Sequence, residues 1–222
     1  MSGDGYPVFT YSVIIVCSLV FIGTLILPFD LVTQIYSSYA LNSVTFLYGN
    51  SYMKLVTYQF LHLNFQHLIS NMFVLFCIGR AIENEIGSTK FGFTYLSAGI
   101  ISGLLHVLFN QGSEAMVVGA SGAIFGVIAV LLLLRPFKFT SAMIIPVPGV
   151  VLGISMLVVE VASIMLSTNV WVAHDVHLYG FIVGALASFG IDYNRALKGL
   201  IISVVILLCL YYWAFYVEGI VL

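Results

Sequence analysis

Long apolar runs recur along this chain, and they constrain its fold more than any other feature. A helix needs about 20 mostly apolar residues to cross the hydrocarbon core of a bilayer. We predict seven membrane helices, over 8–28, 62–81, 91–110, 120–134, 142–167, 173–191 and 199–218. Only 7% of the residues are charged, whereas soluble domains carry about 25%. The sequence therefore predicts an all-α polytopic membrane bundle, formed as a single domain over 1–222.

The placement of lysine and arginine predicts the orientation of this bundle. Cytoplasmic loops of membrane proteins are enriched in these residues. Six of the seven basic residues lie in or border the second, fourth and sixth connections between predicted helices, and Lys54 is the exception. We predict a multi-pass protein of the cell membrane, with a cytoplasmic N-terminus and an extracytoplasmic C-terminus. The first residues lack the basic cluster of a cleaved signal peptide, so the first helix is predicted to be retained.

The remaining composition narrows the possible functions. A net charge of −2 provides no basic surface, so no nucleic-acid partner is predicted. The three cysteines lie far apart in apolar runs and are interpreted as buried thiols rather than as a metal site. The longest segment between predicted helices, 29–61, is apolar and aromatic, and we expect it to lie on or partly in the membrane.

Four polar side chains interrupt the apolar pattern at similar depths. His67 and Asn71 lie near the start of the second predicted helix, Ser121 opens the fourth, and His177 lies near the start of the sixth. These three helices are predicted to run in the same direction, so the four side chains are expected a short way below the outer surface. Because polar groups inside a membrane are costly, they mark candidate functional sites. The common depth predicts one active site near the outer face.

These residue types can perform nucleophilic catalysis together. A serine hydroxyl becomes a nucleophile when a neutral histidine accepts its proton, so we assign Ser121 as nucleophile and His177 as base. Attack on an amide creates an oxyanion that needs hydrogen-bond donors. The candidate donors are His67, Asn71 and the Ser121 backbone N–H at a helix start. No carboxylate is required, and Asp175 is expected to point about 200° around the helix from His177.

Glycines at helical spacing predict a close contact between the fourth and sixth helices, which would bring Ser121 to His177. The glycines assigned to packing at the site are Gly119, Gly122, Gly126, Gly180 and Gly184. Taken singly, each feature also has a structural explanation, because small residues usually serve helix packing and a lone intramembrane histidine is usually a structural group. The combination points to catalysis.

Several stretches, in one order along the chain, resemble the motifs of a known family. They are FLH at 60–62 with HLISNM at 67–72, the run from Gly79 to Tyr95, GASGAIFG at 119–126 and HLYGFIVG at 177–184. Together they resemble the rhomboid family of intramembrane serine proteases. The resemblance extends from about Tyr52 to Gly184, which is most of the chain.

The resemblance implies a mechanism and a substrate class. It implies a Ser–His dyad of Ser121 and His177, and an oxyanion site formed by His67, Asn71 and the Ser121 amide. The implied partners are the lipid bilayer and the transmembrane segments of single-span membrane proteins, which would be cut near the outer surface. The family implies neither a metal nor a cofactor.

The resemblance also implies an architecture, with some departures. A rhomboid-like six-helix core would occupy about 8–192, and one extra C-terminal helix would occupy about 199–218, in a 6+1 arrangement. Met53-Lys54 stands where the family usually has Trp-Arg, and Val176 where it commonly has Ala. The carboxyl group of Glu160 lies near the middle of the fifth predicted helix, where it is expected either to pair with a neighbouring polar group or to control gating or water access.

Other classes of membrane protein fit less well. A catalytically silent rhomboid-like scaffold that binds membrane helices is the main alternative, but such relatives lose the serine or the histidine, and this chain has both. A metalloprotease needs His-Glu-x-x-His, which is absent from the sequence. An aspartyl protease needs two membrane aspartates, and the first five predicted helices contain none. A transporter would favour repeated halves with a site near the midplane.

Overall fold

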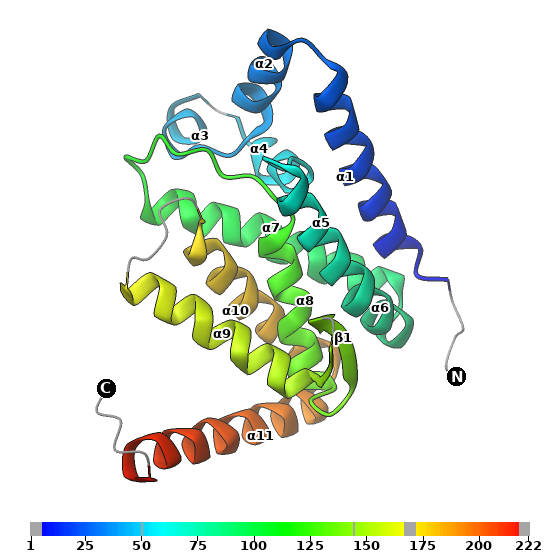
Figure 1. Cartoon of the computed structure of the whole chain (residues 1–222), viewed down its shortest axis with the longest axis vertical. Coiled ribbons are helices and arrows are strands. Elements are labelled where there is room, and N and C mark those ends of the chain that lie inside the picture. The colour runs from blue at the N-terminus through cyan, green and yellow to red at the C-terminus, as the bar shows by residue number, and fades with distance from the viewer. Residues whose placement is uncertain (1–5, 50, 144, 167–171, 218–222) are drawn as a thin grey trace.

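Helices account for most of the computed structural model, which describes residues 6–49, 51–143, 145–166 and 172–217 (Figure 1). Within these residues, five helical runs are long and apolar enough to cross a membrane. They are α1 (Val8–Ile26), the run Phe65–Ile86, α7 (Ser88–Phe109), α9 (Gly149–Leu166) and α11 (Tyr193–Tyr212). The chain is therefore a multi-pass helical membrane protein, as the sequence predicts. The full count of seven spans stays a prediction.

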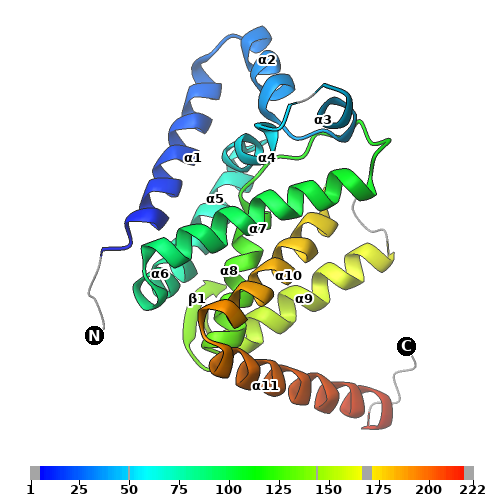
Figure 2. The same cartoon turned by 180° about the vertical axis from the view of Figure 1, so that it is seen from behind.

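Two further helices complete the bundle. These are α8 (Ser121–Leu134) and α10 (His174–Ile191). Every residue of α8 after its first is buried, and α7, α9, α10 and α11 all contact it (Figure 1 and Figure 2). A helix that is apolar on all sides is suited to this central position. The site described below is built at the N-terminal end of this central helix.

The second predicted helix is one continuous run with a change of helical type in its middle. It consists of α5 (Phe65–Val74), a π-helical segment η2 (Leu75–Gly79) and α6 (Arg80–Ile86). Glu83 in α6 accepts hydrogen bonds from the backbone N–H groups of Phe9 and Thr10, at 2.8 and 2.7 Å. These amides belong to the first turn of α1, where a helix has no internal acceptors for them. The Glu83 carboxylate therefore joins the start of α1 to α6.

The segment predicted not to span, 29–61, folds into short helices between α1 and α5. These are α2 (Phe29–Tyr39), α3 (Ser43–Gly49), α4 (Lys54–Thr57) and a 3-10 turn, η1 (Tyr58–Phe60). The ammonium group of Lys54 is buried and donates to the carbonyl oxygen of Ser37 at 2.8 Å and to Thr45 Oγ1 at 3.0 Å. Burial lowers the pKa of Lys54. One side chain thus ties α2, α3 and α4 together.

The predicted start of the fifth helix is wrong. Residues before Gly149 form two antiparallel strands, β1 (Phe139–Met143) and β2 (Ile145–Pro148), in which Thr140 pairs with Val147. Proline has no backbone N–H and favours extended backbone in the residue before it. Pro146 and Pro148 therefore oppose a helix here, and α9 begins directly after them.

Smaller differences concern helix ends and cysteines. The last helix begins at Tyr193 rather than at 199, because Asp192 caps it by accepting from the backbone N–H of Arg195 at 3.1 Å. Cys17 is buried as expected, but Cys77 is half-buried and Cys209 is exposed on the outside of the bundle. Positions 144, 167 and 218 of the predicted helices lie outside the described residues.

Basic side chains gather around one carboxylate at the end of α8 that is distant from Ser121. Glu85 forms ion pairs with Arg135, with Lys138 at 3.8 Å and with Arg195 at 2.9 Å. Because α8 has 14 residues, this cluster and Ser121 are separated by about 21 Å of helix. The bundle therefore has a basic end and an opposite end that carries the polar cavity.

Candidate active site

Ser121 and His177 lie in direct contact. Ser121 is the first residue of α8, and its Oγ lies 2.7 Å from His177 Nε2 in the first turns of α10. Gly119, two residues before Ser121, has φ at +121°, a conformation that L side chains rarely adopt. Its N–H donates to the carbonyl oxygen of Tyr58 at 2.9 Å. The glycine-rich turn thus sets the position at which the serine enters the helix.

Glycine pairs allow α8 and α10 to approach closely enough for this contact. A Cβ on Gly180 would overlap the carbonyl oxygen of Gly122. A Cβ on Gly184 would likewise overlap the carbonyl oxygen of Gly126. The backbone of one helix therefore lies against the backbone of the other, as the small-residue pattern predicts.

The imidazole ring of His177 is held on two sides. The ring of Phe125, one turn after Ser121 in α8, stacks on it with a centroid separation of 4.5 Å and an interplanar angle of 6°. On its other edge, Nδ1 of His177 lies 3.0 Å from Oε1 of Glu160 in α9. The ring is thus fixed between α8 and α9 with Nε2 directed at the serine hydroxyl.

The two predicted oxyanion donors come from α5. A Cβ on Gly119 would lie 2.7 Å from His67 Nε2 and 3.6 Å from Asn71 Nδ2, so both side chains face the turn that leads into Ser121. Asn64 caps α5 and accepts from the His67 backbone N–H at 2.8 Å. Asn71 Nδ2 is buried and has no hydrogen-bond partner among the described residues. A buried donor without a partner is costly, which is consistent with a place prepared for an acceptor.

A cavity of about 770 Å³ connects these groups. His67, Asn71, Ser121 and His177 all line it, together with apolar side chains that include Leu63, Met116, Phe125 and Val172. Tyr58 also lines the cavity, and its buried hydroxyl donates to the carbonyl oxygen of Gly99 at 2.7 Å. Burial raises the pKa of Tyr58 to about 12, so this hydroxyl keeps its proton near neutral pH.

Asp175 points away from His177, as the helical geometry predicts. Its Oδ2 lies 2.7 Å from Nδ1 of His106 in α7, and it accepts from Nδ2 of Asn110, which caps the end of α7, at 3.0 Å. Asp175 therefore joins α10 to α7, and it has no contact with the imidazole of His177 that would let it orient the base.

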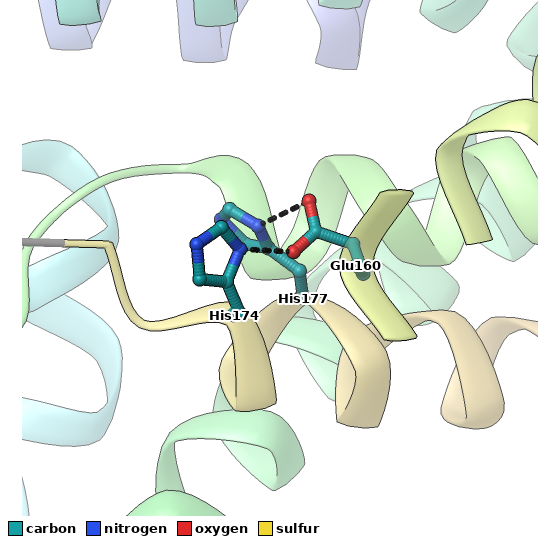
Figure 3. Close-up of side chains that lie close together, drawn as sticks. All are labelled: Glu160, His174 and His177. Atoms are coloured by element: carbon teal, nitrogen blue, oxygen red, sulfur yellow. Dashed lines mark hydrogen bonds and ion pairs between the residues drawn. The ribbon is translucent and has the colours of Figure 1, made fainter. Parts of the chain in front are cut away.

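Sequence reasoning gave Glu160 no definite role, and the structure places it against the candidate base (Figure 3). One carboxylate oxygen lies 3.0 Å from His177 Nδ1, and the other lies 2.6 Å from His174 Nδ1. The sequence does indicate that Glu160 is unusual, because an ionisable residue within an apolar membrane span is costly and therefore a candidate for function. The partner could not be deduced, because a sequence does not give the rotation of α9 relative to α10.

Among the described residues, the same three side chains are also the set that could bind a metal ion. Glu160, His174 and His177 each offer one ligand atom, and these atoms lie within 4.8 Å of one another. A carboxylate and two imidazoles form a donor set that zinc accepts. The sequence predicts no metal, and the atoms concerned are those that form the two hydrogen bonds of Glu160.

A helical membrane bundle with a serine–histidine pair in a polar cavity defines a class of protein that includes intramembrane proteases. Residues 49–194 match the Rhomboid domain family. The chain therefore belongs to the rhomboid family, as the motifs predict. The match covers the segment from the short helices before α5 to the start of α11, and it contains every predicted site residue.

Relatives from plants and bacteria share parts of this region. RHOMBOID-like protein 5 from Arabidopsis thaliana is 38% identical over 79 residues, which are 36% of this chain and 26% of that protein. Rhomboid protease GluP from Bacillus subtilis (strain 168) is 32% identical over 129 residues, which are 58% of this chain and 25% of that protein. RHOMBOID-like protein 6, mitochondrial, from Arabidopsis thaliana is 29% identical over 143 residues, or 64% of this chain and 44% of that protein. The chain thus spans less than half of the length of each relative.

Proposed function

We propose that this protein is an intramembrane serine protease that hydrolyses peptide bonds in or next to the transmembrane segments of single-span membrane proteins. The observation that carries the proposal is the 2.7 Å contact between Ser121 Oγ and His177 Nε2 inside a cavity of a rhomboid-family bundle. The similarity to a bacterial protein that is named a rhomboid protease supports it.

The chemistry follows from the positions of these groups. His177 Nε2 accepts the proton of the Ser121 hydroxyl while Oγ attacks the substrate carbonyl carbon. The negative charge on the former carbonyl oxygen is stabilised by donors from His67, Asn71 and the Ser121 backbone N–H. His177 then gives its proton to the leaving amine. A water molecule, activated by the same histidine, hydrolyses the acyl-enzyme and restores Ser121.

The length of α8 supports a site below the membrane surface. Its 14 residues rise about 21 Å, whereas the hydrocarbon core is about 30 Å thick. If the basic end of the bundle lies at the cytoplasmic interface, Ser121 lies several ångströms within the opposite half of the membrane. In a cell membrane this orientation gives a cytoplasmic N-terminus, an extracytoplasmic C-terminus and an active site near the outer face.

Cleavage in reconstituted vesicles tests the proposal. The purified protein is combined in liposomes with a panel of single-span membrane proteins that carry tags at both ends, and the products are analysed by mass spectrometry. We expect cleavage within or beside a transmembrane segment for the natural sequence, and no cleavage for Ser121→Ala or His177→Ala. Binding of substrates without cleavage would instead support the silent scaffold, and cleavage by Ser121→Ala would contradict the assignment of the nucleophile.

A further inference from the structure

We propose that Glu160 is a positioning residue for His177, so that this protein works with a Ser–His–Glu arrangement rather than with a serine and a histidine alone. The inference rests on the proposed function, because it concerns the same base. Its components come from three helices: Ser121 from α8, His177 from α10 and Glu160 from α9.

The contacts form a continuous line through the imidazole ring. Nε2 of His177 lies 2.7 Å from Ser121 Oγ, and Nδ1 on the opposite edge lies 3.0 Å from Glu160 Oε1. The stacked ring of Phe125 restricts rotation out of this plane. In serine hydrolases with a third member, a buried carboxylate occupies this place relative to the histidine.

The carboxylate determines which ring nitrogen carries the proton. An ionised carboxylate can only accept hydrogen bonds, so the neutral His177 must hold its proton on Nδ1 to bond with Glu160. Nε2 is then left with a lone pair directed at the Ser121 hydroxyl, which is the form that a general base requires. When His177 takes the serine proton, the negative charge of Glu160 stabilises the resulting imidazolium.

His174 holds the carboxylate in place. Its Nδ1 lies 2.6 Å from the second oxygen of Glu160 (Figure 3). His174 and His177 are three residues apart in α10, so both rings lie on the face of that helix next to Glu160. With both oxygens engaged, the carboxylate has one preferred orientation. Glu160 is only 6% exposed, and a buried carboxylate in a membrane helix is costly without such partners.

The distances favour hydrogen bonds over a metal site. Ligand atoms around a tetrahedral zinc ion are about 3.3 Å apart, because each lies about 2.0 Å from the ion. The oxygen–nitrogen separations here are 2.6 and 3.0 Å, which are lengths typical of charge-assisted hydrogen bonds. A zinc ion would also take the Nδ1 lone pair of His177, which in this arrangement is occupied by a proton.

Substitution of Glu160 tests the inference. Glu160→Gln keeps the shape and removes the charge, and Glu160→Ala removes the acceptor. The matched control is Ser155→Ala on the same helix, where the hydroxyl bonds only to the Leu152 carbonyl oxygen among the described residues. The first readout is the second-order rate of Ser121 modification by a fluorophosphonate in detergent. We expect that rate to fall by about tenfold or more in both Glu160 variants and to be unchanged in the control. Glu160→Gln keeps the shape of the side chain, so its melting temperature should stay near that of the natural sequence.

The second readout does not depend on catalysis. Nitrogen-15 NMR of selectively labelled histidine reports which ring nitrogen of His177 is protonated. We expect a hydrogen-bonded Nδ1 proton in the natural sequence and loss of that signal in Glu160→Ala. Labelling at the natural rate in both Glu160 variants, or a His177 without a proton on Nδ1, would overturn the role of Glu160. If the natural sequence is not labelled, the protease proposal fails, and the NMR signal alone decides whether Glu160 orients His177.

Discussion

Two buried carboxylates in this protein each form hydrogen bonds with groups on a neighbouring helix. Glu83 accepts from two backbone N–H groups at the start of α1 and from Ser88 Oγ at 2.6 Å. Glu160 contacts two imidazoles. Both carboxylates are buried, and an unpaired buried charge is costly. Each therefore joins two helices: Glu83 joins α6 to α1, and Glu160 joins α9 to α10.

Substitution of Glu83 should weaken the attachment of α1. In Glu83→Ala the backbone N–H groups of Phe9 and Thr10 lose their acceptor, which costs about 1–3 kcal/mol for a buried donor. We expect a lower unfolding midpoint in detergent, measured by circular dichroism. The control is Glu114→Ala, where the side chain is exposed. Equal midpoints for the two variants would show that the Glu83 contacts contribute little.

Polar residues in apolar segments are the site candidates that a sequence indicates most directly, because burying a polar group in a membrane is costly. This argument identifies four residues, because a polar side chain in an apolar run is kept only when it has a structural or functional role. They are His67, Asn71, Ser121 and His177. The structure brings all four to one cavity. The same argument singles out Glu160, but the sequence does not identify its partner. That partner depends on the rotation and tilt of α9 against α10, and packing across the whole bundle determines these.

Among the elements, α8 and α10 carry the site, and their contact depends on glycine. The backbones of these helices meet at Gly122 and Gly180, where a Cβ on Gly180 would leave no room for the carbonyl oxygen of Gly122. The separation of the two helices therefore sets the distance between Ser121 and His177.

Gly180→Ala should impair the site through this separation. The added methyl group meets a backbone atom that cannot move aside, so the helices must part, at a cost of about 1–3 kcal/mol. We expect slower modification of Ser121 by a fluorophosphonate together with a lower melting temperature. Gly190→Ala, in the same helix, is the control, because a Cβ there meets nothing within 4 Å. Unchanged reactivity in Gly180→Ala would mean that helix separation does not limit the contact.

The short helices α2 to α4 depend on a single buried cation. Lys54→Met removes hydrogen bonds to Ser37 and Thr45, and a hydrogen bond from a charged donor contributes about 1.5–3 kcal/mol. We expect backbone amides of α2 and α3 to exchange with deuterium roughly tenfold faster, as measured by mass spectrometry. Lys90→Met alters an exposed lysine and should leave these rates unchanged. Identical exchange in both variants would contradict an anchoring role for Lys54.

Element boundaries were less predictable than the elements themselves. Hydropathy placed the fifth helix at 142–167 because the residues before α9 are as apolar as the helix, yet β1 and β2 occupy the first part of that range. Pro146 and Pro148 are the residues that indicate extended backbone in this segment rather than helix. By contrast, the predicted ranges of the fourth and sixth helices agree with α8 and α10 to within one residue, because a glycine-rich turn and a polar segment mark their starts.

At the scale of the whole molecule, two groups of charged and polar side chains lie at opposite ends of the bundle. One end holds Glu85 with Arg135, Lys138 and Arg195, and the other holds the cavity with Ser121. This polarity follows from the sequence, because the basic residues concentrate in alternate connections.

An accessibility experiment tests the predicted orientation. In a variant lacking the three native cysteines, a single cysteine replaces either Gln111, on the cavity side, or Phe137, on the basic side; both residues are exposed. In intact bacterial cells, we expect a membrane-impermeant maleimide to label Gln111→Cys. We expect Phe137→Cys to be labelled only after the membrane is opened. The reverse pattern would contradict the orientation and would move the site to the cytoplasmic half.

The central claim is that Ser121 is an activated nucleophile. The most direct measurement is treatment of the detergent-purified protein with a fluorophosphonate probe, followed by peptide mass spectrometry to locate the adduct. We expect one adduct, on Ser121, which is absent in Ser121→Ala and strongly reduced in His177→Ala, because the hydroxyl contacts the imidazole at 2.7 Å. Equal labelling of the natural sequence and Ser121→Ala would contradict the claim.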